Sequence, residues 1–262
     1  MATEESRGLR SDRLGAVLKI TLDRPPANAF SVPMAQALRS ALQNASEDAA
    51  VRCVLLTGAG KLFSAGQDVS TIGNVSPQVV QQTLHELYNP CVLLMRTMPK
   101  PVVAAVNGPA AGMGLGLVLA ADQRLAARSA RFVFGFTAIG LTADCGVSAL
   151  LPAWVGPSQA FRMAFQEEPL TADQAETCGL VANVCEDSEL EGRAAAWAER
   201  LAGGPTLALA MTKQALNKSV FPDLECRMEE EAGRQAAAVQ TSDAQEGVRA
   251  FLEKRRAAFQ GA

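Results

Sequence analysis

A loop of small residues, Asn107–Gly116, lies between an apolar β-type run and an apolar run of helical character. Gly112 and Gly114 carry no side chain, so a ligand could lie directly against the backbone there. Amides that open a helix lack intrahelical acceptors and stand at the positive end of the helix dipole. The loop is therefore suited to holding an oxygen atom that develops negative charge. Such loops are common and most bind nothing, so the loop alone does not define a site.

Asp144, which follows the glycine loop, is the one acid in the chain that we assign to catalysis. A second small-residue stretch, Phe63–Asp68, stands at the exit of an earlier β-type run. One carboxylate near backbone donors can remove a proton from a substrate and return it at another atom. Because an apolar run extends from Asp144 to Trp154, this residue also fits the role of a plain helix N-cap, and both interpretations stay open.

Metal and triad chemistry find little support in the sequence. Its only histidine is His85, and the cysteines form no CxxC pair, so no His/Cys metal set is present. A Ser/His/Asp or Cys/His triad would have to use His85 as its base. We interpret the cysteines as free thiols in a reducing cytosol, and therefore expect a cytoplasmic protein. The cysteines are Cys53, Cys91, Cys145, Cys178, Cys185 and Cys226.

The bulk properties describe an ordinary globular protein. The chain has 262 residues, is 48% apolar, and carries a net charge of −3 without any basic run, so we expect no nucleic-acid partner. No apolar stretch is long enough to span a bilayer, and the charged N-terminal residues are typical of neither a signal peptide nor an anchor. We therefore expect no membrane partner.

Hydrophobic periodicity predicts alternating strands and helices through the first two thirds of the chain and helices alone after that. The expected strands are Ala16–Leu22, Val51–Thr57, Val102–Val106, Leu125–Ala127, Phe132–Phe134 and Val181–Val184. The expected C-terminal helices are Glu189–Ala202, Pro205–Asn217, Leu224–Gln240 and Ala244–Phe259. This order predicts an α/β core followed by a helical C-terminal region.

Three local expectations complete this prediction. Residues 1–15 are interpreted as a polar arm. Ser31 is expected to cap a helix that runs to about Asn44. Pro90 disfavours helical backbone at Asn89, so we expect a break there and a new helix that starts at Pro90.

Six pieces of the sequence follow one another in the order of a known family and span nearly the whole chain. They are LDRPPANAF, VRCVLLTGAGKLFSAGQDV, PKPVVAAVNGPAAGMGLGLVLAAD, GLTADCGVSALLPAWVG, LTADQAETCGLVANV and GPTLALAMTKQALN. Together they resemble the crotonase (enoyl-CoA hydratase/isomerase) superfamily. Within it, Tyr88-Asn89-Pro90 before the third strand, and Ile139-Gly140-Leu141 before Asp144, are most similar to the 1,2-epoxyphenylacetyl-CoA isomerase group.

The resemblance implies a crotonase-like spiral of ββα units with a helical C-terminal trimerisation region. We accordingly divide the chain into a core with an acyl-CoA site, residues 1–200, and an oligomerisation subdomain, residues 201–262. The resemblance further implies a homotrimer or homohexamer. It implies an acyl-CoA thioester as substrate, with coenzyme A present only as part of that substrate, and no separate cofactor or metal.

Position by position, the resemblance implies that the backbone amides of Gln67 and Met113 hold the thioester oxygen. It implies that the carbonyl of Ala65 accepts from the adenine and that Arg24 and Lys213 contact phosphates, although a solvated surface residue is an equal interpretation of both. The other residues assigned to substrate or CoA binding are Ala27, Gly66, Asp68, Gly112 and Phe136. Phe132, Phe134 and Phe136 are expected to form an apolar wall.

Departures from the family pattern bear on the activity. Hydratases of the family carry two glutamates, and the matching positions here hold Gly116 and Phe136, so standard hydration is disfavoured. Asp144 matches an aspartate of the epoxyphenylacetyl-CoA isomerases, naphthoate synthases and 4-chlorobenzoyl-CoA dehalogenases. We therefore predict an isomerase that shifts a double bond or opens a ring epoxide of an acyl-CoA, as in fatty acid metabolism or phenylacetate degradation, with Asp144 as acid and base. The alternatives are a hydratase-like enzyme, a dehalogenase or hydrolase in which Asp144 is the nucleophile, and an acyl-CoA-binding homologue without activity.

Overall fold

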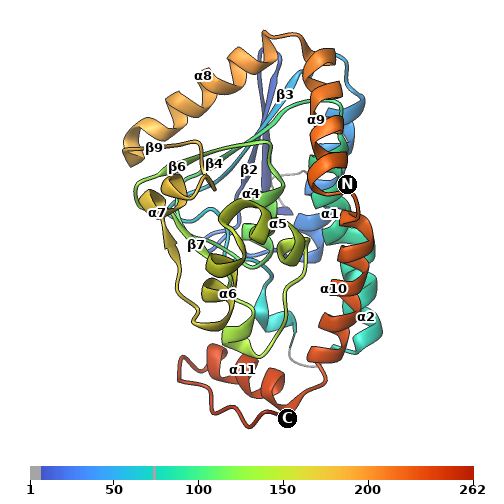
Figure 1. Cartoon of the computed structure of the whole chain (residues 1–262), viewed down its shortest axis with the longest axis vertical. Coiled ribbons are helices and arrows are strands. Elements are labelled where there is room, and N and C mark those ends of the chain that lie inside the picture. Colours follow the sequence, from blue (N-terminus) through green and yellow to red (C-terminus); the bar gives the residue numbers. More distant parts are fainter. Residues whose placement is uncertain (1–6, 73–74) are drawn as a thin grey trace.

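The computed structural model describes residues 7–72 and 75–262. Its main sheet has six strands in the order β1-β2-β3-β4-β6-β9, and the twisted strands cross the upper half of the molecule in Figure 1. β1 and β2 are antiparallel, and every later neighbour is parallel. The bounds are β1 Leu9–Leu14, β2 Val17–Leu22, β3 Cys53–Gly58, β4 Val102–Val106, β6 Gln123–Ala127 and β9 Asn183–Cys185.

A small second sheet lies beside the glycine loop. β7 (Arg131–Val133) pairs with β5 (Ala110–Ala111) in parallel and with β8 (Leu170–Thr171) in the antiparallel direction. An isolated bridge from Ser64 to Ala110 connects the loop after β3 to this sheet, and a second bridge, from Phe30 to Gln67, connects the loops after β2 and β3 to each other. Strands and helices alternate through β9, as the sequence predicts, and only helices follow it.

Alternating side chains bury both faces of the main sheet, as expected for a parallel sheet. One face packs against α8 (Leu190–Ala202), which lies along the upper left of Figure 1. The opposite face packs against the helices α1 (Val32–Glu47), α3 (Asn89–Thr97) and α4. α4 (Met113–Ala120) is the central helix, and all of its residues are buried. The strand residues on the α8 face are Val17, Cys53, Leu55, Val103, Ala105, Leu125 and Ala127.

α9 (Thr206–Val220) and α10 (Leu224–Ala238) run down one side of the molecule, and α11 (Ser242–Leu252) lies at its lower end (Figure 1). α10 packs against α2 (Pro77–Thr83) and α5 (Val147–Val155), which places it against the core. None of the helices in residues 7–72 and 75–262 has the length and apolar character needed to cross a membrane. The remaining α-helices are α6 Pro157–Phe165 and α7 Ala172–Thr177.

The predicted cap of α1 is confirmed. Ser31 has extended backbone, and its hydroxyl accepts from the amide of Met34 at 3.4 Å. The polar arm is wrong for the part that the structure describes, because Leu9–Leu14 is strand β1, paired with β2 along its whole length. Only the first residue of β1 is buried, so an exposed edge strand accounts for the polar sequence. Residues 1–6 of the predicted arm lie outside the described residues.

The predicted break at Asn89 is also wrong. The chain stays helical from α2 through a π-helical turn, η3 (Leu84–Tyr88), into α3. Pro90 has no amide proton to offer the carbonyl of Glu86, and the guanidinium of Arg39 donates to that carbonyl instead, at 2.6 Å. The wider turn and the external donor together allow a proline inside a continuous helical segment.

The last predicted helix, Ala244–Phe259, ends early. α11 stops at Leu252, and the chain then folds back on its own helix. Arg255 pairs with Glu246 at 2.6 Å, and the carbonyl of Ala262 accepts from the amide of Asp243 at 3.0 Å. These contacts turn the final residues away from a helical path.

Asn28 fixes the loops that lead to the site. It is buried with φ of 49°, and its side-chain amide donates to the carbonyls of Ala59 and Leu62 at 2.9 and 2.8 Å. Its own carbonyl accepts from the hydroxyl of Ser64 at 2.8 Å. Asn28 therefore ties the loop after β2 to the loop after β3.

We expect Asn28→Ala to lower the free energy of unfolding by about 2–4 kcal/mol, because buried carbonyls lose their donor and alanine is strained at positive φ. Urea denaturation measures the change. Asn44→Ala, at an exposed position of α1, is the control and should stay within about 0.5 kcal/mol of the parent. Equal effects of the two variants would contradict the role given to Asn28.

Candidate active site

Gln67 lies in a short parallel bridge that leaves its own amide free. The carbonyl of Gly66 accepts from the amide of Phe30 at 2.7 Å, and the amide of Asp68 donates to the carbonyl of Phe30 at 3.0 Å. In such a bridge the central residue points its N–H and C=O to the other side. Within the described residues the Gln67 amide has no protein acceptor, so it can donate to a ligand.

The second predicted donor, Met113, is the first residue of α4. Its amide has no intrahelical acceptor, and Gly112 precedes it with φ of 52° and ψ of −124°, which only glycine adopts readily. Gly66, with φ of 87°, packs so closely that a Cβ there would lie 2.8 Å from the Ala111 oxygen and 3.3 Å from the Met113 nitrogen. The loop that carries Gln67 and the start of α4 are thus in direct contact.

Asp144 precedes a sharp turn in which two successive residues have left-handed backbone. Cys145 has φ of 54° and Gly146 has φ of 76°. A non-glycine residue in this region is strained by about 1–2 kcal/mol, so surrounding contacts must hold it. The N-cap interpretation of Asp144 is wrong, because Gly146 stands at the cap of α5 and no side chain caps it from that position.

The Asp144 carboxyl is 5% exposed, and burial raises its pKa to about 6. The negative charge of Glu231 raises the pKa further, while hydrogen bonds from Cys145 and Gln235 lower it. The amide of Gln235 donates to Asp144 Oδ2 at 3.0 Å. A carboxyl with a pKa near neutrality can both accept and return a proton at physiological pH.

Gln67 and Asp144 line the same small cavity, of about 30 Å³. This volume holds about two water molecules, so the carboxyl is poorly hydrated. Tyr88 also lines the cavity, and burial raises the pKa of its phenol. The other lining residues are Ile72, Val75, Val80, Thr83, Leu84, Leu141, Gln235 and Val239.

The two positions where the family resemblance implied glutamates in hydratases are filled differently here. A Cβ on Gly116 would lie 2.9 Å from the Cys145 oxygen, so the turn that carries Asp144 occupies the space of a side chain. The ring of Phe136 lies about 3.9 Å from where a Cβ of Gly112 would stand, and packs edge-on against Phe134 with centroids 5.1 Å apart. The three predicted phenylalanines are buried, but Phe132, Phe134 and Phe136 do not line the Asp144 cavity.

The predicted CoA-binding residues of the two early loops lie close together. Arg24 pairs with Asp68 at 2.9 Å and donates to the carbonyl of Ala29. Ala65 is exposed, and its amide donates to the carbonyl of Ala27 at 2.9 Å. Asp68 also caps the short turn η2 (Val69–Thr71). The role of this group in CoA binding stays a prediction.

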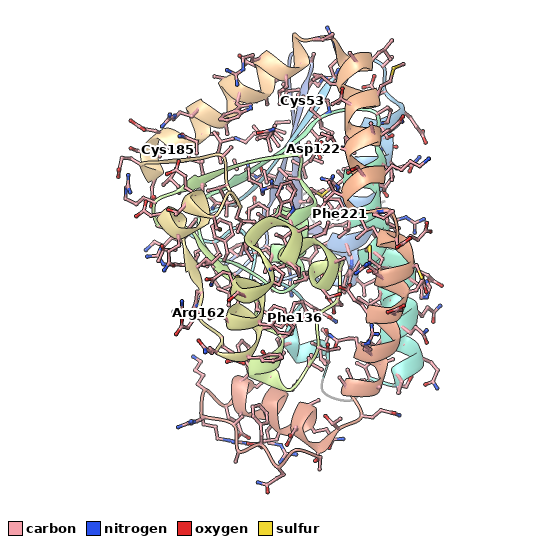
Figure 2. All side chains as sticks on the ribbon, viewed as in Figure 1. Cys53, Asp122, Phe136, Arg162, Cys185 and Phe221 are labelled. Atoms are coloured by element: carbon pink, nitrogen blue, oxygen red, sulfur yellow. The ribbon has the colours of Figure 1, made fainter. Side chains whose placement is uncertain are left out.

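Lys213 is wrong as a phosphate contact. Its side chain is 8% exposed and its ammonium lies 2.8 Å from an oxygen of Asp122. It also donates to the carbonyls of Met95 and Lys100, at 2.6 and 3.1 Å, so all three of its protons are used. Figure 2 shows Asp122 in the upper half of the molecule, away from Phe136 in the lower half. Lys213 therefore joins α9 to the core.

His85 and Asn89 line a second cavity, which Asp144 does not reach. The imidazole of His85 lies 2.7 Å from a carboxyl oxygen of Glu229. A mechanism in which Asp144 attacks as a nucleophile needs a base to activate water, and His85 is not in position for it. Tyr88 lines the Asp144 cavity, whereas its neighbour Asn89 lines this second one.

Two site residues escaped the sequence analysis, Glu231 and Gln235 on α10. Both are buried, at positions that continue the apolar stripe of Leu224 and Met228. Polar residues inside an apolar helix stripe are costly unless they are hydrogen-bonded, so their placement was the signal that could have identified them.

Comparison with known proteins agrees with this arrangement. A family model described as enoyl-CoA hydratase/isomerase matches residues 12–262. The chain is 40% identical over 250 residues to 1,2-epoxyphenylacetyl-CoA isomerase of Escherichia coli K12, covering 94% of this chain and 95% of that protein. It is also 40% identical over 243 residues to a probable enoyl-CoA hydratase of Rhodobacter capsulatus, with 92% and 93% covered.

Among solved structures, an enoyl-CoA hydratase from Mycobacterium avium subsp. paratuberculosis K-10 superposes with a TM-score of 0.88 at 34% identity, covering 97% of this chain and 98% of that one. The chain therefore belongs to the enoyl-CoA hydratase/isomerase family and has the crotonase fold. It is an acyl-CoA enzyme of this superfamily.

The close approach at Gly66 generates the first prediction for the site. We expect Gly66→Ala to lower kcat about 100-fold or more, because a methyl group there must displace the Gln67 or Met113 amide. Steady-state kinetics on an accepted acyl-CoA measures the effect. Gly60→Ala is the matched control, since Gly60 also has positive φ but nothing within 4 Å of a Cβ. Equal losses in both variants would show that backbone strain alone is responsible.

The raised pKa of Asp144 generates a stability prediction. Between about pH 4 and pH 6 the folded chain binds more protons at Asp144 than the unfolded chain, so stability falls as the pH rises through this window. Asp144→Asn does not ionise, and we expect it to be more stable than the parent by about 3 kcal/mol above pH 6 and about equal below pH 4.

Urea denaturation of both proteins between pH 4 and pH 7 measures this difference. Asp223→Asn is the control, because it makes the same substitution at an exposed carboxylate directly before α10. Parallel stability curves for the parent and Asp144→Asn would contradict the raised pKa.

Proposed function

We propose that the protein is an acyl-CoA isomerase that uses Asp144 as its single acid and base. In this mechanism the amides of Gln67 and Met113 hold the thioester oxygen, and Asp144 removes a proton from the α-carbon. The electron pair moves onto the oxygen and forms an enolate. Asp144 then delivers a proton to the γ-carbon, and the double bond moves from C3 to C2 with no net loss or gain of atoms. While the enolate is held, the proton on Asp144 can exchange with solvent, so product formed in D₂O carries deuterium.

The observation that carries this proposal is that Asp144 is the only carboxyl group lining the cavity shared with Gln67 in the described chain. Its pKa of about 6 suits removal and return of one proton near neutral pH. The two free amides lower the energy of the enolate, and donors of this kind contribute about 3–4 kcal/mol each. A ring-epoxide acyl-CoA is a second substrate of the same class, supported by the similarity to the isomerase of Escherichia coli.

Hydration is less well supported by the residues present. It requires one group to activate water and another to deliver a proton. Gly116 leaves no room for a second acid, and Phe136 supplies an apolar ring instead of a carboxylate. Several similar proteins are named as probable hydratases, so the experiment must measure both reactions.

The test is incubation with a 3-enoyl-CoA and a ring-epoxide acyl-CoA in D₂O, followed by mass spectrometry of the acyl group. We expect isomerised product with deuterium in the acyl chain from the parent protein. Asp144→Asn should lose both, by about 10²- to 10⁴-fold, because Asp144 is the only carboxyl group that lines the cavity in the described chain. Circular dichroism and binding of a non-reactive acyl-CoA thioether establish that this variant is folded and binds its ligand.

A 2-enoyl-CoA in the same series detects hydration through formation of the 3-hydroxy product. Hydration that is faster than isomerisation would contradict the proposal. Tight binding without exchange in either protein would leave an acyl-CoA-binding homologue.

A further inference from the structure

α10 presents two buried polar side chains to the segment that carries Asp144. Glu231 and Gln235 are one helical turn apart, and they are 2% and 4% exposed. Between them they contact alternate residues along 142–148, the stretch that connects the loop after η4 (Thr137–Ile139) with α5. No sheet or helix ladder fixes this stretch before α5 begins at Val147.

Gln235 makes two contacts that together orient Asp144. Its side-chain carbonyl accepts from the amide of Thr142 at 3.1 Å, and its side-chain amide donates to Asp144 Oδ2 at 3.0 Å. One planar group therefore holds both the backbone before Asp144 and its carboxyl oxygen. The other oxygen, Oδ1, is left without a contact from Gln235.

Glu231 holds the strained side of the turn. Its carboxylate accepts from the amide of Gly146 at 2.7 Å and from the amide of Ser148 at 2.7 Å. Gly146 follows Cys145, whose left-handed backbone is unfavourable by itself. The two charge-assisted bonds fix the turn and stabilise the start of α5, where negative charge interacts favourably with the helix dipole.

We infer that Glu231 and Gln235 are positioning residues for Asp144, fixing the 142–148 turn and the direction in which its carboxyl faces the cavity. This inference rests on the proposed role of Asp144 as acid and base. The two residues have opposite effects on the pKa of Asp144. Glu231 places a negative charge near Asp144 and raises this pKa, whereas Gln235 donates a hydrogen bond to the ionised Asp144 carboxylate and lowers it.

Few titratable groups surround Asp144, and none of those facing it is a cation. Glu231 approaches from α10, Tyr88 from η3, and Cys145 from the same turn. Cys91 of α3 lies near Cys145 and Tyr88. Asp68 acts on Tyr88 from the early loop. Burial raises the pKa of Glu231, and Arg234, also on α10, lowers it. No cation acts on Asp144 itself, so removing the charge of Glu231 eliminates a repulsion at Asp144.

The experiment compares Gln235→Met with Glu231→Gln. In both we expect kcat to fall between about tenfold and a hundredfold with little change in KM, because the carboxyl is misplaced while the CoA site is intact. The acidic limb of the kcat profile should move to higher pH in Gln235→Met, which loses a hydrogen bond to the ionised carboxylate. It should move to lower pH in Glu231→Gln, which loses a repulsive charge.

Glu230→Gln is the matched control, since it makes the same change one residue away on the exposed face of α10. We expect its kcat and pH profile to equal those of the parent. A merely structural role for Glu231 and Gln235 would lower the amount of folded enzyme and shift the limb in neither variant, or shift it in one common direction. Either result would overturn the inference.

A second measurement is independent of turnover. Titration of ¹³C-labelled aspartate carboxyl carbons by NMR, with the Asp144 signal assigned by its loss in Asp144→Asn, follows the carboxyl directly. Opposite shifts of this signal's pKa in the two variants support the inference even where no substrate turns over, and an unchanged pKa in both contradicts it. If the proposed function is wrong, the parent protein will exchange no α-proton of an acyl-CoA in D₂O. That result is distinct from an unchanged pKa of Asp144 in the two variants.

Discussion

The site depends on the burial of one carboxyl group without a cation to pair with it. Residues 7–72 and 75–262 supply no ion pair to Asp144, and its pKa rises because water is excluded and Glu231 is near. An isolated buried carboxylate is unfavourable, so the group lies between its two protonation states near neutral pH. The same environment that destabilises the fold gives the residue the proton affinity that acid–base chemistry needs.

The backbone around this group is arranged by close approach, which only glycine allows. Gly66 brings the Gln67 loop onto the start of α4, and Gly116 lets the Cys145 turn lie against the same helix. α4 thus meets the Gln67 loop at its first residue and the turn that carries Asp144 about one helical turn later. Because the helix is buried on all sides, neither segment can move away without opening the core.

Much of this arrangement could be predicted from the sequence. Apolar runs such as Val102–Val106 gave strands at their observed places, because burial on both faces of a parallel sheet leaves a strong local signal. β1 was missed because an exposed edge strand has a polar sequence, and Pro90 misled because the donor that replaces its amide, Arg39, comes from another helix. The partners of Lys213 are likewise distant in sequence, so nothing local distinguished a buried ion pair from a phosphate contact.

The buried polar residues of α10 show why the site could be predicted only in part. Gly112 and Asp144 carry their chemistry in their own residue types, so pattern and family resemblance could find them. Glu231 and Gln235 act only through the turn they hold, and their contacts span 83 to 93 residues of chain. The C-terminal helices therefore complete the cavity around Asp144 that the core begins, and a division of the chain at residue 200 would separate Asp144 from the α10 side chains that contact it and its turn.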